Sequence, residues 1–214
     1  ESEGYYIDLA EDHWGKYARA LAEGYAYQGE VSRFAGNTPR GEPSAHLPPT
    51  AFVDFIQNHD QIGNRAFGER LLDLAEHEIV EVQTAILLLS PHVPLLFMGE
   101  EYGETRPFCF FTDFHGELAD AVREGRRREF IHFAAFNGSP DELWQIPDPN
   151  AESTFQASKL DWAKLETEAG RTWNAFVRAL LAVRHARIVP LLKGAGGNAG
   201  KVLLADDGAI AVDW

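Results

Sequence analysis

The chain has 214 residues, and its 33 acidic and 19 basic side chains give it a formal net charge of −14 at pH 7. A composition with 45% hydrophobic and 24% charged residues is typical of a packed globular protein and excludes disorder for the bulk of the chain. The negative charge argues against nucleic acids and anionic membrane surfaces as partners, because proteins bind both through Lys and Arg.

The first quarter of the chain predicts a helix, a loop and a strand, in that order. Apolar residues recur at three- and four-residue spacing over residues 9–27, which predicts a helix. Residues 32–49 are rich in glycine and proline and predict a long irregular loop. Residues 51–57 (AFVDFIQ) are mostly apolar or aromatic, which predicts a short strand buried on both faces.

A second strand follows after another helix. Residues 93–98 (VPLLFM) form an apolar run that predicts a buried strand. Between the two strands, a helical pattern over residues 71–89 places one apolar face on Leu72, Ala75, Ile79, Val82, Ile86 and Leu89. A strand, a helix and a strand at this short spacing form a βαβ unit, so we expect the two strands to be parallel.

The second half of the chain is less regular. Residues 105–148 show no clear period and contain a basic cluster, GRRRE at 125–129, which suits either a solvated helix end or an anchor for neighbouring polar groups. Residues 173–187 predict an amphipathic helix. The segments 202–205 and 209–214 flank an Asp-Asp-Gly turn, which predicts a hairpin and, with it, a separate β domain that begins near residue 195.

The ends of the chain and its cysteine content bear on its context. The chain begins without an initiator methionine or a basic leader and ends inside a strand-like run, so we expect a segment of a longer enzyme. No stretch approaches the roughly 20 apolar residues that a bilayer-spanning helix needs. Cys109 is the single cysteine, which excludes an internal disulfide and a thiolate zinc site. We expect a cytoplasmic location, because nothing calls for an oxidising compartment.

Polar side chains gather where each predicted strand ends. The sequence Gln57-Asn58-His59-Asp60-Gln61 follows the first strand, and Gly99-Glu100-Glu101-Tyr102 follows the second. In parallel α/β barrels that end of the sheet carries the catalytic side chains. Two simpler interpretations stay open: the first group is a capping turn into the next helix, and the second is a pair of solvated carboxylates.

Aromatic residues lie close to these polar groups in the sequence, where Asp113 and His115 are surrounded by Phe108, Phe110, Phe111 and Phe114. Carboxylates accept hydrogen bonds from hydroxyls, and aromatic rings pack on the apolar face of a pyranose, so the combination predicts a carbohydrate site. A metal site is an alternative, although none of the known ligand spacings is present; its ligands would be His59, Asp60, Asp113 and His115. No nucleophile-elbow or nucleotide-binding motif occurs.

Three stretches together resemble one family of glycoside hydrolases. They are FVDFIQNHDQIGNRAFGERL (52–71), PLLFMGEEYG (94–103) and PFCFFTDFHGELADAVREGRRREF (107–130), and the stretches GYYIDL and ALAEGYAYQGEVS fit the same family. The Asn-His-Asp motif at 58–60 is shared across the α-amylase superfamily. The three stretches in this order resemble one branch of it, the maltooligosyltrehalose trehalohydrolases, over nearly the whole chain.

The resemblance implies an α/β fold that is only part of a (β/α)8 TIM barrel. Residues 1–194 would supply strands 7 and 8 with helices 6–8, and residues 195–214 would begin a truncated C-terminal β-sandwich domain. The nucleophile and the general acid of the family lie on strands 4 and 5, outside this chain, so we expect the fragment to be inactive alone. Open strand edges imply that it associates with itself or with the missing N-terminal part of the barrel.

The implied reaction is hydrolysis of the α-1,4 bond next to the terminal trehalose of a maltooligosyl trehalose, with retention of configuration and without a cofactor or metal. By match to the motif, Asp60 is the catalytic residue that stabilises the transition state, and the same motif implies substrate binding by Asn58, His59, Gln61 and Arg65. Further substrate-binding residues are predicted from their position and chemistry alone: Glu101, Tyr102, Phe111, Asp113 and His115. The alternatives are an α-glucan branching enzyme or amylase of the same superfamily, and a non-catalytic glucan-binding relative.

Overall fold

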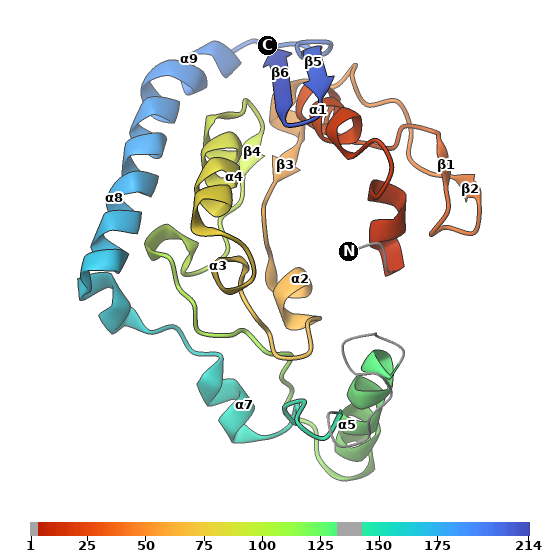
Figure 1. Ribbon diagram of the computed structural model, residues 1–214, viewed down its shortest axis with the longest axis vertical. Helices are drawn as coiled ribbons and strands as arrows, with labels where there is room; N and C mark the ends of the chain where they lie inside the picture. The colour runs from red at the N-terminus through yellow and green to blue at the C-terminus, as the bar shows by residue number, and fades with distance from the viewer. Residues whose placement is uncertain (1–3, 132–142) are drawn as a thin grey trace. The chain divides into compact units, whose positions relative to one another are not determined.

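Figure 1 shows the computed structural model of the protein, which describes residues 4–131 and 143–214. The described α-helices are α1 (His13–Glu23), α2 (His59–Gly63), α3 (Leu71–Leu74), α4 (His77–Leu89), α5 (Gly116–Phe130), α7 (Glu152–Ala157), α8 (Glu168–Val183) and α9 (Val189–Leu192). The strands are β1 (Val31–Ser32), β2 (Thr38–Pro39), β3 (Val53–Asp54), β4 (Val93–Pro94), β5 (Lys201–Asp206) and β6 (Ala209–Asp213). The other described helical segments are η1 (Gly4–Leu9), η2 (Pro49–Ala51), η3 (Glu100–Tyr102), η5 (Trp162–Glu166) and the π-helical η6 (Arg184–Ile188).

The contacts divide the chain into two compact units, each of which is described by itself. The first contains Glu1–Asp54, Ile86–Leu95 and Leu180–Trp214, and the second contains Phe55–Ala85 and Leu96–Ala179. In the part of the chain that the structure describes, no helix is both long and apolar enough to span a bilayer. The domain boundary near residue 195 stays a prediction.

In the first unit, β3 and β4 are parallel neighbours. Val53 lies opposite Val93 and Asp54 lies opposite Pro94, with α4 between the two strands in the chain. The predicted βαβ unit is therefore confirmed. Each strand has only two residues, which is shorter than the apolar runs of the sequence suggest.

The predicted burial of these strands on both faces is wrong. Val53 and Val93 are 55% and 41% exposed, whereas the adjacent Phe52 and His92 are buried. The rings of Phe52 and His92 lie 5.1 Å apart, and His92 Nδ1 is 2.7 Å from Asp54 Oδ2. Successive side chains of a strand point to opposite faces, and the described part of the chain covers only one of them.

Helix α1 packs against the β5–β6 hairpin. The buried residues of α1 are Ala18 and Leu21, which confirms the centre of the helix predicted over residues 9–27. Trp214 Nε1 donates a hydrogen bond to the Leu21 carbonyl (3.1 Å). The turn between the strands contains Gly208 with φ of +80°, a conformation that favours glycine. The predicted hairpin is thus confirmed.

The glycine- and proline-rich loop is anchored by a buried carboxylate. Asp8, in η1, accepts hydrogen bonds from Ser32 Oγ (2.5 Å) and from the Phe34 amide (3.1 Å). These bonds lower the pKa of Asp8. The loop also contains the short antiparallel pair β1–β2, in which Val31 lies opposite Pro39, so it is less irregular than the sequence predicts.

The helix predicted over residues 71–89 is broken into two. The break falls at Ala75, whose backbone is extended (φ −126°, ψ 159°) between α3 and α4. Within α4 the predicted apolar face is not the buried one, because Ile79 and Val82 are 52% and 56% exposed. The positions of α4 that are buried instead are Val80, Thr84, Leu87 and Leu88.

Helix α5 occupies part of the segment for which the sequence shows no period. Its buried residues are Ala119, Arg126 and Phe130, which lie at helical spacing. An arginine at a buried position interrupts the apolar pattern, which explains why the sequence predicts no helix here. Phe130 packs with Leu143 and Ile146 in a small core.

The helix predicted over residues 173–187 is α8 followed by η6. Arg184 begins η6, is 8% exposed, and donates hydrogen bonds to three main-chain carbonyls. The acceptors are Leu88 (3.1 Å), Ser90 (2.5 Å) and His92 (2.6 Å). These carbonyls belong to the end of α4 and the turn into β4, so one guanidinium group orders the approach to the second strand.

The exposed valines of β3 and β4 predict that the isolated chain associates with itself or with the rest of a longer protein. Replacing Val53 and Val93 by threonine keeps the β-branched shape but lowers the apolar exposure, so this variant should associate less. Light scattering over a range of concentrations measures the effect. The control is Val189→Thr, which changes a valine of similar exposure (40%) in α9. A monodisperse monomer for the unsubstituted chain would contradict the prediction.

Candidate active site

The Asn-His-Asp motif forms the start of α2. Asn58 is the N-cap: its backbone is extended (φ −144°, ψ −179°), and its Oδ1 accepts a hydrogen bond from the Gln61 amide (2.9 Å). Asparagine suits this position because its side chain satisfies a backbone N–H that the first helical turn leaves without a partner. The capping turn considered from the sequence is therefore present, and it fixes His59 and Asp60 in the first turn of the helix.

His59 and Asp60 project into solvent. Their side chains are 69% and 71% exposed, and His59 Nε2 lies 3.3 Å from Asp60 Oδ1. The partial positive charge at a helix N-terminus favours a carboxylate in the first turn. Gln61 is also exposed, whereas Arg65 forms an ion pair with Glu69 (Nε to Oε2, 3.3 Å). The turn thus presents hydrogen-bonding groups that a ligand hydroxyl can reach.

A buried hydrogen-bonded link supports the residue that precedes Asn58. Gln57 and Glu100, each 8% exposed, come from the segments that follow β3 and β4. Gln57 Oε1 accepts from the Leu71 amide (3.0 Å), and the Gln57 side chain hydrogen-bonds the Glu100 carboxyl. Glu100 Oε2 also accepts from the Phe97 amide (2.5 Å). The two polar segments predicted from the sequence are therefore joined in the structure.

Burial raises the pKa of Glu100 to about 7. The hydrogen bonds from Gln57 and the Phe97 amide, together with the charge of Arg70, favour the ionised carboxylate and oppose the rise in pKa. The neighbouring charge of Glu101 adds to the rise in the pKa of Glu100. For Glu100 the interpretation as a solvated carboxylate is therefore wrong, because removal from water dominates its titration.

Arg70 holds the main chain on both sides of η3. It is 1% exposed, and it donates from Nε to the Arg106 carbonyl (2.7 Å) and from Nη1 to the Met98 carbonyl (2.8 Å). Its guanidinium carbon lies 5.1 Å from the centre of the Phe97 ring. Burial lowers the pKa of Arg70. The sequence signals neither this role nor the link between Gln57 and Glu100, because tertiary contacts alone create them.

The two other predicted residues of this loop are tied to the protein. Glu101 Oε2 accepts from the Gly99 amide (2.9 Å), and the Glu101 carbonyl accepts from Asn174 Nδ2 (2.9 Å). Tyr102 is 1% exposed, and its hydroxyl donates to Glu104 Oε2 (3.2 Å). Both residues stabilise the loop that follows β4, and their roles in substrate binding stay predictions.

Phe111, Asp113 and His115 lie in the segment before α5. The Phe111 ring is half-buried between Phe108 and Phe155, at centroid distances of 5.7 and 5.3 Å. Asp113 and His115 are 98% and 85% exposed, with Oδ1 and Nε2 3.9 Å apart. Within residues 4–131 and 143–214, no three His, Cys, Asp or Glu side chains are grouped so that they could hold a metal ion.

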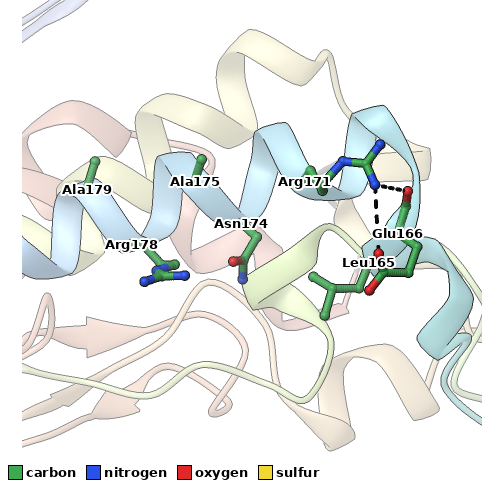
Figure 2. Close-up of a pocket in the computed structure, with 7 residues that line it drawn as sticks. All are labelled: Leu165, Glu166, Arg171, Asn174, Ala175, Arg178 and Ala179. Atoms are coloured by element: carbon green, nitrogen blue, oxygen red, sulfur yellow. Dashed lines mark hydrogen bonds and ion pairs between the residues drawn. The ribbon is translucent and has the colours of Figure 1, made fainter.

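A hollow on α8 and η5 contains none of the predicted site residues (Figure 2). Its lining residues are Leu165, Glu166, Arg171, Asn174, Ala175, Arg178 and Ala179. Arg171 is held there by the carbonyl and the carboxylate of Glu166. The candidate site is therefore the exposed first turn of α2 rather than this hollow.

Known proteins resemble the chain over most of its length, although no family model matches it. It is 44% identical over 189 residues to the malto-oligosyltrehalose trehalohydrolase of Deinococcus radiodurans, covering 86% of this chain and 30% of that protein. The protein of the same name from Saccharolobus solfataricus is 42% identical over 163 residues, which cover 76% of this chain and 26% of that protein. A Salmonella typhimurium crystal structure, provisionally described as an alpha amylase, matches with 56% identity and a TM-score of 0.93, covering 100% of this chain and 35% of that one. The chain thus spans about a third of the length of these relatives.

Replacing Glu100 by glutamine should flatten the dependence of stability on pH. The folded protein keeps the Glu100 proton up to about pH 7, whereas the unfolded chain releases it near 4.5. The folded state therefore binds more protons between these values, so the free energy of unfolding falls as pH rises from 4.5 to 7, by up to about 3 kcal/mol. The neutral glutamine should remove this slope, which urea unfolding between about pH 5 and pH 8 measures. The matched control is Glu117→Gln at an exposed position, and an equal slope in Glu100→Gln and the unsubstituted protein would rule out the assignment.

Proposed function

We propose, on the confirmed resemblance of this chain to malto-oligosyltrehalose trehalohydrolases, that the complete protein hydrolyses the α-1,4 bond next to the terminal trehalose of a maltooligosyl trehalose. The observation that carries the proposal is the 44% identity over 86% of the chain to a protein of that name. The products are trehalose and a shortened maltooligosaccharide. The protein is then a glycoside hydrolase of the α-amylase superfamily, located in the cytoplasm, and it needs no cofactor.

The chain supplies part of a (β/α)8 barrel in this proposal. Strands 7 and 8 would be β3 and β4, whose parallel pairing supports the assignment, and residues 195–214 would begin the C-terminal β domain. A polar segment follows each strand, as expected at the catalytic end of a barrel. The parallel pair alone does not make a complete substrate cleft, so the isolated fragment is expected to be inactive.

Asp60 is assigned the stabilisation of the transition state. Its exposed carboxylate can accept hydrogen bonds from the 2- and 3-hydroxyls of the sugar at subsite −1, and His59 beside it can donate to the same sugar. These interactions strengthen as the sugar takes on oxocarbenium-like charge. The mechanism is retaining, with a nucleophile and a general acid that lie outside this chain, about 5 Å apart.

Five further predicted residues are assigned to the reducing-end side of the site, where trehalose would bind: Glu101, Tyr102, Phe111, Asp113 and His115. Asp113 and His115 are the best placed of them to contact a ligand, because their side chains are almost fully exposed. Glu101, Tyr102 and Phe111 would shape the loops on which such contacts depend. Asn58 orients the turn through its cap, and substrate binding on the same side as Asp60 is assigned to Gln61 in α2 and to Arg65 just beyond it.

A second candidate function is that of an amylase or a branching enzyme of the same superfamily. The Salmonella typhimurium structure favours it, because a protein 56% identical to the chain is provisionally described as an alpha amylase. The two functions differ in the bond that is cut and in the substrate that is required. A non-catalytic glucan-binding protein is the third candidate, and it would lack the two carboxylates that lie outside this chain.

The complete protein should release free trehalose from maltooligosyl trehalose and little glucose or maltose from a linear maltooligosaccharide of equal length. Chromatography of the two reaction mixtures measures this preference. Release of short maltooligosaccharides without trehalose would replace the proposal by the amylase function. Binding of the glucan without any cleavage would favour the non-catalytic relative.

Asp60→Asn in the complete protein should lower kcat by roughly 10³-fold and change KM much less, because the lost interaction is made mainly in the transition state. Steady-state kinetics on maltooligosyl trehalose measure both constants. Asp207→Asn, in the exposed turn of the β5–β6 hairpin, is the matched control and should leave both unchanged. Near-normal turnover by Asp60→Asn would remove this residue from the mechanism.

A further inference from the structure

Arg126 is the buried member of the basic cluster at 125–129. Its side chain is 5% exposed, whereas Arg128 is exposed and Arg127 pairs with Glu124 (2.9 Å). Arg126 Nη1 lies 2.9 Å from the Glu129 carboxylate, which is itself 62% exposed. The cluster is thus not simply a solvated helix end, because the Arg126 side chain points into the protein and that of Arg127 is only 13% exposed.

The buried guanidinium of Arg126 contacts the end of α2. Nη2 donates to the Gly63 carbonyl (2.7 Å) and to the Arg65 carbonyl (2.6 Å). The last carbonyls of a helix have no partners within it, and a positive charge at this end is favourable. Arg126 therefore closes the C-terminus of α2, while Asn58 caps the N-terminus of the same five-residue helix.

Asp60 lies between these two caps. Its carbonyl accepts the Asn64 amide (2.9 Å), a bond that spans the single turn from Asp60 to the segment held by Arg126. A helix of one turn is not stable by itself, because nucleation costs more than its few hydrogen bonds return. The orientation of the Asp60 carboxylate consequently depends on groups outside α2.

The guanidinium of Arg126 is itself fixed by aromatic rings. Its central carbon lies 5.4 Å from the centre of the Phe110 ring and 4.7 Å from that of Phe130. Phe130 belongs to the small core with Leu143 and Ile146. A buried charge stabilises a fold poorly compared with an apolar residue of the same size, but a planar fork can hold two carbonyls in one geometry.

We propose that Arg126 is a positioning residue for the reaction: it fixes the one-turn helix α2 and thereby the direction of the Asp60 carboxylate. This inference rests on the proposed function of Asp60. Arg126 then affects the chemical step without touching the substrate. A displacement of a catalytic group by about 1 Å can lower a rate by about 10²-fold, so a modest shift of α2 is enough.

The test combines Arg126→Lys and Arg126→Met with Asp60→Asn in the complete protein. Lysine keeps the positive charge but lacks the planar guanidinium group. If Arg126→Met does not fold, Arg126→Lys still allows the test. Arg128→Lys and Arg128→Met are the matched controls, because Arg128 lies in the same helix α5 but is exposed. We expect Arg126→Lys to lower kcat at least about 10-fold with little change in KM, and to have no further effect on kcat when Asp60 is already asparagine.

Two kinetic outcomes would overturn the inference. One is a folded Arg126→Lys variant with the kcat of Arg128→Lys. The other is an equal loss of kcat in the presence and absence of the Asp60 carboxylate, because a merely structural contribution would not depend on that group.

A second measurement separates this inference from the proposed function. Hydrogen exchange of the amides of residues 61–65 needs no substrate, and it should be faster in Arg126→Lys than in Arg128→Lys. If the unsubstituted protein releases no trehalose, the proposed function fails while the exchange experiment still reports on α2. Unchanged exchange in Arg126→Lys would overturn the positioning role whatever the substrate is.

Discussion

Guanidinium groups that are buried against main-chain carbonyls hold the irregular parts of this chain in place. Arg70, Arg126 and Arg184 are each less than a tenth exposed, and each donates to at least two carbonyls distant in sequence. Burial lowers the pKa of Arg70 and of Arg184, but both stay protonated because arginine starts from a very high pKa. A charge that cannot be lost must be compensated, and carbonyl groups at chain turns supply the compensation.

This constraint explains how such short elements stay ordered. The parallel strands β3 and β4 have two residues each, and α2 has five. Arg184 fixes the turn that leads into β4, Arg70 fixes the loop that follows it, and Arg126 fixes the end of α2. Each arginine therefore acts where a strand or a helix stops, which is where backbone groups lose their regular partners. Order at the candidate site comes from side-chain donors more than from sheet or helix length.

The difference between prediction and structure follows from the same contacts. The centre of α1, the β5–β6 hairpin and the parallel β3–β4 pair were predictable, because they depend on local periodicity, turn residues and chain order. Helix α5 was not, since Arg126 occupies an apolar position of its pattern. The exposure of Val53 was not predictable from its apolar run, because the described residues cover only the opposite face of β3. At the site, the Asn-His-Asp motif located Asp60, but only the folded chain shows that Gln57 is linked to Glu100.

Asp60 and Glu100 show how one region of the protein gives two acidic side chains opposite properties. Asp60 stands in solvent in the first turn of α2, which leaves its oxygens available to a ligand. Glu100 is buried, and its pKa of about 7 leaves it partly protonated near neutral pH. The two carboxyl groups therefore suit different tasks, because the exposed one can reach a ligand and the enclosed one accepts the Phe97 amide in the loop that follows β4.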